Sequence, residues 1–167
     1  MKNICFGLKG KAFPMAVGGG VVLAAALLTR FLCGSPLWFL RWSDVSGLLP
    51  PLWLLSLLWM TAYVAVGCAA GYLFSCPAWG VARESHLWRG STFLILAVGV
   101  SLVWYTLLFG KHYLLPSWLC LPVSALAAGV CGASWWRLQR AVGCVAWMFG
   151  IWQAVLFFLQ LAVLLRL

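Results

Sequence analysis

Residues 50–63 read PPLWLLSLLWMTAY, and the lack of charge in and around this stretch decides the class of fold. The stretch belongs to an interval, 45–82, that holds no Asp, Glu, Lys or Arg. Other intervals without these residues cover 12–29, 90–110, 112–136 and 141–165. A helix that crosses about 30 Å of hydrocarbon needs about 20 apolar residues, and each interval can supply one. The sequence therefore predicts five membrane-spanning segments.

Composition excludes a soluble domain and a membrane β-barrel. The 167 residues are 65% hydrophobic and 8% charged, whereas soluble domains have about 25% charged residues. Spanning segments must be helices or closed barrels, because hydrocarbon offers backbone groups no hydrogen-bond partner. Barrel strands alternate apolar and polar residues, and these segments do not. We predict an all-α membrane protein, a five-transmembrane-helix bundle forming one domain over 1–167, with helices at about 14–31, 50–74, 91–109, 113–136 and 141–165.

The formal charge of +9 comes from basic residues that are scattered between the predicted spans. They form no stripe along one element, so they do not indicate a nucleic-acid partner. One side of the membrane would carry Lys2, Lys9, Lys11, Arg83, Arg89, Arg137 and Arg140. The other side would carry Arg30, Arg41, Lys111 and Arg166. The positive-inside rule therefore favours a cytoplasmic amino terminus.

The amino-terminal segment also resembles a signal peptide, because it is basic, then apolar, then rich in small residues. No small-x-small cleavage site follows the apolar run, and Arg30 and Leu32 are unsuited to lipoprotein-type cleavage before Cys33. We therefore expect a retained first helix.

Residues that perform acid–base or metal chemistry are scarce. Asp44 and Glu84 are the acidic residues, and both fall in predicted loops. His86 and His112 lie at span ends without ligand-spaced partners, and the seven cysteines show no paired short spacing. Proton-coupled transporters generally need titratable groups inside the membrane, which the second, third and fifth spans lack. The sequence predicts no metal site and no cofactor.

Small residues recur four positions apart in three of the predicted helices. The sets are Gly67 with Gly71, Ala125 with Gly129 and Ala133, Ala128 with Gly132, and Gly150 with Ala154. This spacing lets helix backbones approach closely in lipid. Two interpretations stay open: packing within one bundle, or a seam between two copies of the chain.

Eight of the twelve tryptophans fall into two groups. Those expected in the headgroup layer are Trp38, Trp42, Trp88, Trp118 and Trp136. Trp59 is different, because it lies about nine residues into its helix and therefore below the headgroups. Tyr63 follows on the same face, and Gly67 would leave room beside the two rings. Trp104 and Trp152 also lie away from helix ends.

A buried indole N–H or phenol needs a hydrogen-bond partner, which hydrocarbon does not provide. We therefore predict that these rings turn inward around a cavity that holds a flat, partly polar ligand. The alternative is a bundle core packed with aromatic residues and no cavity.

The segment PPLWLLSLLWMTAYVAVGCAAGYLF resembles the second helix of the translocator protein family, the tryptophan-rich sensory proteins also known as peripheral benzodiazepine receptors. The positions that match its pattern are Pro50, Pro51, Trp53, Trp59, Thr61, Tyr63 and Gly67. The third predicted helix keeps Trp104 and the Phe109-Gly110 ending, and the resemblance covers about residues 12–166. Departures are Ser101-Leu102 for the family's Asn-Trp, Gln160 for an Asn, and Leu161 for the tyrosine of the proposed cholesterol motif.

The resemblance implies a membrane receptor for tetrapyrroles such as porphyrins and haem, and for sterols or similar lipids in some members. It implies a pocket inside the bundle and a homodimer. The ligand-binding residues would be Trp53, Trp59, Tyr63, Ser101, Trp104, Trp152 and Gln160. Trp59 and Trp152 match the pair with which some bacterial members of the family would degrade porphyrin in light. The resemblance therefore leaves two alternatives open: a porphyrin-degrading enzyme, or a carrier of porphyrins or lipids. Low Lys content favours a bacterial plasma membrane over mitochondria.

Overall fold

The computed structural model describes residues 11–33, 52–76 and 80–165, and nearly all of them are helical. The elements are α1 (Ala12–Cys33), α3 (Leu52–Phe74), α4 (Val81–Tyr105), the π-helical turn η2 (Thr106–Gly110), α5 (Leu114–Trp136) and α6 (Arg140–Leu164). Five helices in the described ranges are long and apolar enough to cross a membrane. The predicted all-α fold with five spanning helices is confirmed.

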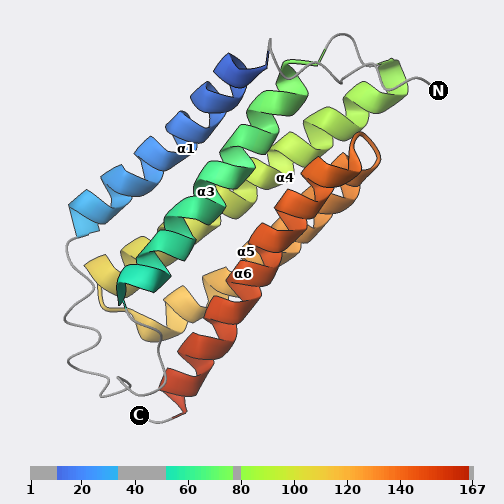
Figure 1. Cartoon of the computed structure of the whole chain (residues 1–167). Helices are drawn as coiled ribbons and strands as arrows, with labels where there is room; N and C mark the ends of the chain where they lie inside the picture. The colour runs from blue at the N-terminus through green and yellow to red at the C-terminus, as the bar shows by residue number, and fades with distance from the viewer. Residues whose placement is uncertain (1–10, 34–51, 77–79, 166–167) are drawn as a thin grey trace.

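The five helices run up and down along roughly a common direction (Figure 1). They form two groups: α1 packs on α3, while α5 packs on both α4 and α6. The groups meet chiefly where α3 contacts α6. We call this contact the α3–α6 seam. In Figure 1, α3 and α6 run in opposite directions along it.

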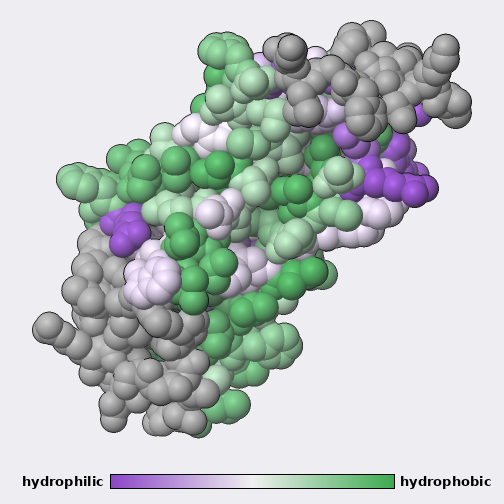
Figure 2. Space-filling model, viewed as in Figure 1, coloured by the Kyte–Doolittle hydropathy of each residue, from purple (hydrophilic) through white to green (hydrophobic). Residues whose placement is uncertain are grey.

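The outer surface of the bundle is apolar. Large exposed side chains include Ile95 on α4, Leu126 on α5 and Met148 on α6. Figure 2 shows hydrophobic residues along the flank of the bundle and hydrophilic ones nearer its ends. Contiguous apolar surface of this kind is rare on soluble monomers, and it suits contact with acyl chains.

The described basic residues gather mainly at one end of the bundle, which we call the basic end. It carries Lys11, Arg83, Arg89, Arg137 and Arg140, and the opposite end carries Arg30 and Lys111. The described basic residues are thus divided between the two ends of the bundle as the sequence predicts for the two sides of the membrane.

We expect the basic end to face the cytoplasm, following the positive-inside rule. Single cysteines can test this in a chain whose native cysteines are replaced by serine. On intact bacterial cells, an impermeant maleimide should label Lys111→Cys, whereas Arg137→Cys should react only after permeabilisation. Both native side chains are exposed, so access is not limited by burial. The reverse labelling pattern would show that the orientation is inverted.

Helix α4 begins at Val81, ten residues before the predicted start at 91. The sequence predicts a loop for the charged residues of its first turns, because hydropathy locates the apolar span and not the whole helix. They project from an exposed helix that continues beyond the span, and Glu84 lies in the first turn, where the helix dipole favours an anion. The third predicted helix ends at 109, which is four residues beyond the end of α4 and falls inside η2. The predicted start of the second helix, at 50, lies outside the described residues, and the remaining limits agree with the structure to within two residues.

Glycines bring α1 and α3 into direct backbone contact. A methyl group at Gly67 would overlap the carbonyl of Gly18, and one at Gly71 would overlap the carbonyl of Pro14. The small residues of α3 therefore serve packing within the bundle. The expectation that Gly67 leaves room beside Trp59 and Tyr63 is wrong, because the backbone of α1 occupies that place.

Small residues also join α5 to α6. The Trp147 indole packs on Gly132 and donates a hydrogen bond to the carbonyl of Gly129 at 3.2 Å. A methyl group at Gly150 would lie 3.3 Å from the Ala125 oxygen. The small residues of α5 and α6 therefore also serve packing within one chain.

Candidate functional site

Six rings from four elements are in contact inside the bundle, and we call them the aromatic cluster. They are Trp59 and Tyr63 of α3, Trp104 and Tyr105 of α4, Phe109 of η2, and Phe149 of α6. The Trp59 ring stacks on Tyr105 with centroids 4.9 Å apart. The Tyr63 ring meets Phe149 edge-on at 5.4 Å. Three predicted site residues, Trp59, Tyr63 and Trp104, are thus brought together.

The π-helical turn η2 lies directly after Trp104 and Tyr105. Its signature is the hydrogen bond from the Lys111 N–H to the Thr106 carbonyl, five residues back, at 3.1 Å. The turn brings Phe109 to within 4.6 Å of the Tyr105 ring. Such turns occur frequently at functional sites, although they also serve packing.

A chain of hydrogen bonds crosses the α3–α6 seam beside these rings. The Tyr63 hydroxyl donates to Ser101 Oγ at 2.6 Å, and the Ser101 hydroxyl donates to Gln153 Oε1 at 3.2 Å. All three side chains have zero exposed area. The chain links α3, α4 and α6, and we refer to it as the Tyr63–Ser101–Gln153 chain.

A second polar group ties α4, α5 and α6 together around Gln160. Gln160 Oε1 accepts from the Trp104 indole at 2.8 Å, and its Nε2 donates to Ser117 Oγ at 2.7 Å and to the Leu114 carbonyl at 3.0 Å. The polar atoms of Trp104 and Gln160 therefore satisfy each other. Trp104 can offer a ligand its ring surface, but its N–H is already used.

Several buried polar atoms in the described residues lack a hydrogen-bond partner: the indole nitrogens of Trp59, Trp118, Trp135 and Trp152, together with Gln139 Oε1 and Gln153 Nε2. The Trp59 indole lies close enough to the Tyr63 hydroxyl to interact with it, but it does not reach hydrogen-bond geometry. A buried donor left unpaired costs about 1–3 kcal/mol. Three of these donors, on Trp59, Trp152 and Gln153, belong to helices that meet at the α3–α6 seam.

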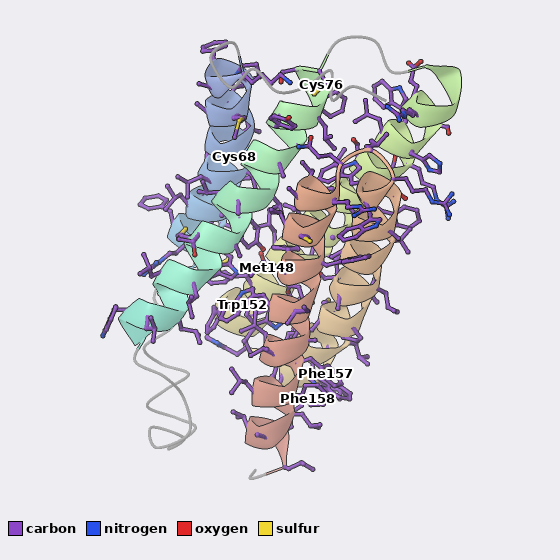
Figure 3. The ribbon with its side chains drawn as sticks, turned by 45° about the vertical axis from the view of Figure 1, so that its right-hand side comes forward. Cys68, Cys76, Met148, Trp152, Phe157 and Phe158 are labelled. Atoms are coloured by element: carbon purple, nitrogen blue, oxygen red, sulfur yellow. The ribbon has the colours of Figure 1, made fainter. Side chains whose placement is uncertain are left out.

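Trp152 lies at the same depth as Trp59. Tyr63 contacts Phe149 across the seam. Trp59 precedes Tyr63 by four residues and Trp152 follows Phe149 by three, which are displacements of roughly 6 Å and 4.5 Å. Because the two helices are antiparallel, both displacements point the same way (Figure 1). Figure 3 shows Trp152 on the side of α6 toward α3.

Trp152 and Trp53 differ from the buried members of the predicted set. Trp152 is half-buried and packs at the margin of the core. Trp53 is 68% exposed and does not join the aromatic cluster. Sequence reasoning missed Tyr105, Phe149 and Gln153. For Gln153 a signal existed, because an amide in the middle of an apolar span must find partners inside the bundle.

The polar side chains that form the site on α3, α4 and α6 are all neutral. Glu84 is the sole carboxylate side chain in the parts of the chain that the structure describes, and it lies at the basic end. Arg30 of α1 is close enough for its charge to act on the Tyr105 hydroxyl. Among the described residues no three His, Cys, Asp or Glu side chains group around a metal position. The arrangement suits the binding of an aromatic ligand, with ring faces for stacking and N–H groups for its polar atoms.

Comparisons of the chain with protein-family models, with curated proteins and with solved structures find no match. The resemblance to the translocator protein family therefore stays a prediction from the sequence.

Proposed function

We propose that the protein is a membrane receptor that binds porphyrin- or haem-type tetrapyrroles, and similar flat hydrophobic ligands, at the α3–α6 seam. The observation that carries the proposal is the pair of buried indole N–H groups on Trp59 and Trp152, which lie at one depth and make no hydrogen bond of suitable geometry. Hydrocarbon cannot satisfy them, whereas a ligand with an aromatic face and polar atoms can.

The aromatic cluster supports the same ligand class. Trp59 stacks on Tyr105, and a flat conjugated ligand would stack on these rings in the same geometry. Trp152 is half-buried, so part of its ring is accessible to a ligand. A tetrapyrrole has a large planar face for these rings, and its neutral core requires no charged residue inside the membrane.

A titration with protoporphyrin IX tests the proposal. The protein is placed in lipid nanodiscs and binding is followed by the shift of the porphyrin Soret band, with empty nanodiscs as the blank. We expect Trp59→Leu to weaken binding about tenfold, because lost stacking and lost ring burial together amount to about 1.4 kcal/mol or more. Trp152→Leu should also weaken binding, although less, because its ring is only half-buried.

The matched control is Trp88→Leu, which makes the same substitution at an exposed indole near the basic end. Its affinity should equal that of the parent chain. If Trp59→Leu and Trp152→Leu both bind protoporphyrin IX as the parent does, the ligand does not occupy the α3–α6 seam and the proposal is wrong. Thermal melting of each variant separates a lost site from a lost fold.

A further inference from the structure

We propose that Gln153 is the polar anchor of this site and that its carboxamide N–H groups bind a carbonyl oxygen of the ligand, in an ester or a carboxylate. The inference rests on the proposed function and adds the chemical group by which the ligand is held. Tyr63, Ser101 and the two indoles support it.

The first argument is the orientation of the Gln153 amide. Its oxygen accepts from Ser101, which in turn accepts from Tyr63, so both hydroxyl hydrogens point along the chain toward Gln153. The amide nitrogen is the other end of the same planar group. It carries two N–H donors, has no exposed area, and finds no partner among the described residues.

The second argument is the contrast with Gln160, seven residues further along the same buried stripe of α6. There both ends of the amide are used: the oxygen by the Trp104 indole, and the nitrogen by Ser117 and Leu114. The bundle thus satisfies one buried glutamine completely and the other only on its oxygen side. A buried amide that is half satisfied is costly, so it needs a specific explanation.

The third argument is the kind of hydrogen-bonding group, donor or acceptor, that is left unpaired. At the seam the unpaired atoms are Trp59 Nε1, Trp152 Nε1 and Gln153 Nε2, and each is a donor. The single unpaired acceptor in the same set, Gln139 Oε1, belongs to the residue that precedes α6 at the basic end. A ligand with oxygen acceptors can pair with these three donors, whereas a ligand with only hydroxyl or amine donors cannot.

Three porphyrins separate the anchor from the ring contacts. Protoporphyrin IX carries two carboxylates, its dimethyl ester carries ester carbonyls, and etioporphyrin carries alkyl groups and no oxygen. In nanodiscs we expect the parent chain to bind the first two at least about fivefold more tightly than etioporphyrin, as for a hydrogen bond made in a buried site. Gln153→Met has a similar length and no N–H, so it should abolish this preference and leave etioporphyrin binding unchanged.

The matched control is Ser124→Ala, which removes a buried hydrogen bond to the Ala97 carbonyl between α5 and α4, away from the seam. This variant should keep the preference for the two porphyrins that carry oxygen, which would show that general loosening of the bundle does not remove it.

Equal binding of all three porphyrins by the parent chain would overturn the role of Gln153 as the anchor and leave the proposed function standing. This outcome is measured on the parent chain, so it does not depend on whether Gln153→Met folds. Tighter binding of the acid than of the ester by more than tenfold would also overturn it, because a cation would then hold the ligand. If none of the three binds, the proposed function fails as well.

Discussion

Gly67→Ala will destabilise the protein by about 2–3 kcal/mol, although it adds a single methyl group. That group would overlap the Gly18 carbonyl oxygen and lie 2.9 Å from the Gly18 carbonyl carbon and from Gly19 Cα. All three atoms are backbone, so no side-chain rotation relieves the overlap, and α1 must move away from α3. Because α1 packs chiefly on α3, the displaced helix has little else to hold it.

The free energy of unfolding can be measured by SDS titration in mixed micelles, followed by tryptophan fluorescence. The control is Gly20→Ala on α1, where a methyl group would meet nothing within 4 Å. That change should be neutral or stabilising by up to about 1 kcal/mol, because alanine is the better helix former. Equal effects of the two substitutions would show that the close approach of α1 to α3 does not exist in the membrane.

Gln160→Leu should cost about 2 kcal/mol, because it removes the hydrogen bonds that join α4, α5 and α6 near the end opposite the basic end. The Trp104 indole, which is 5% exposed, would lose its acceptor. Individual hydrogen bonds between membrane helices contribute about 0.6 kcal/mol on average and at most about 1.7. The estimate therefore rests on three such bonds being lost together.

A double-mutant cycle with Trp104→Phe isolates the indole–amide pair from the rest of the group. The two substitutions should be less costly together than the sum of their separate effects, with a coupling of about 1 kcal/mol. Strict additivity would mean that Trp104 and Gln160 do not interact.

The number of spans could be predicted from charge alone, and so could the limits of the last two. The intervals without charged residues, 112–136 and 141–165, match α5 (Leu114–Trp136) and α6 (Arg140–Leu164) to within two residues. The start of α4 could not be predicted in this way. Arg83, Glu84 and Arg89 lie on a helix that extends past the hydrocarbon, and hydropathy does not report on helix outside it.

The part of the candidate site that depends on spacing along one helix could be predicted from the sequence. The part that depends on which helices contact each other could not. Trp59 and Tyr63 share a face because they are four residues apart, and their rings are in fact 4.7 Å apart. The role of Gly67 was predicted wrongly, because sequence does not say which helix fills the notch beside a glycine. Gln153 could be recognised as an amide inside an apolar span, but its partner could not be named from the sequence, because Ser101 lies 52 positions away in the chain.

The division of the bundle into an α1–α3 pair and an α4–α5–α6 trio gives the seam a further significance. Residues from both sides, Tyr63 on one and Ser101 with Gln153 on the other, meet at the place where the proposed ligand would lie. Anything bound there touches two bodies at once, so its binding free energy depends on their relative angle. By thermodynamic linkage, occupancy would bias a rigid-body rotation of the pair against the trio, and that rotation would be detectable at either membrane surface.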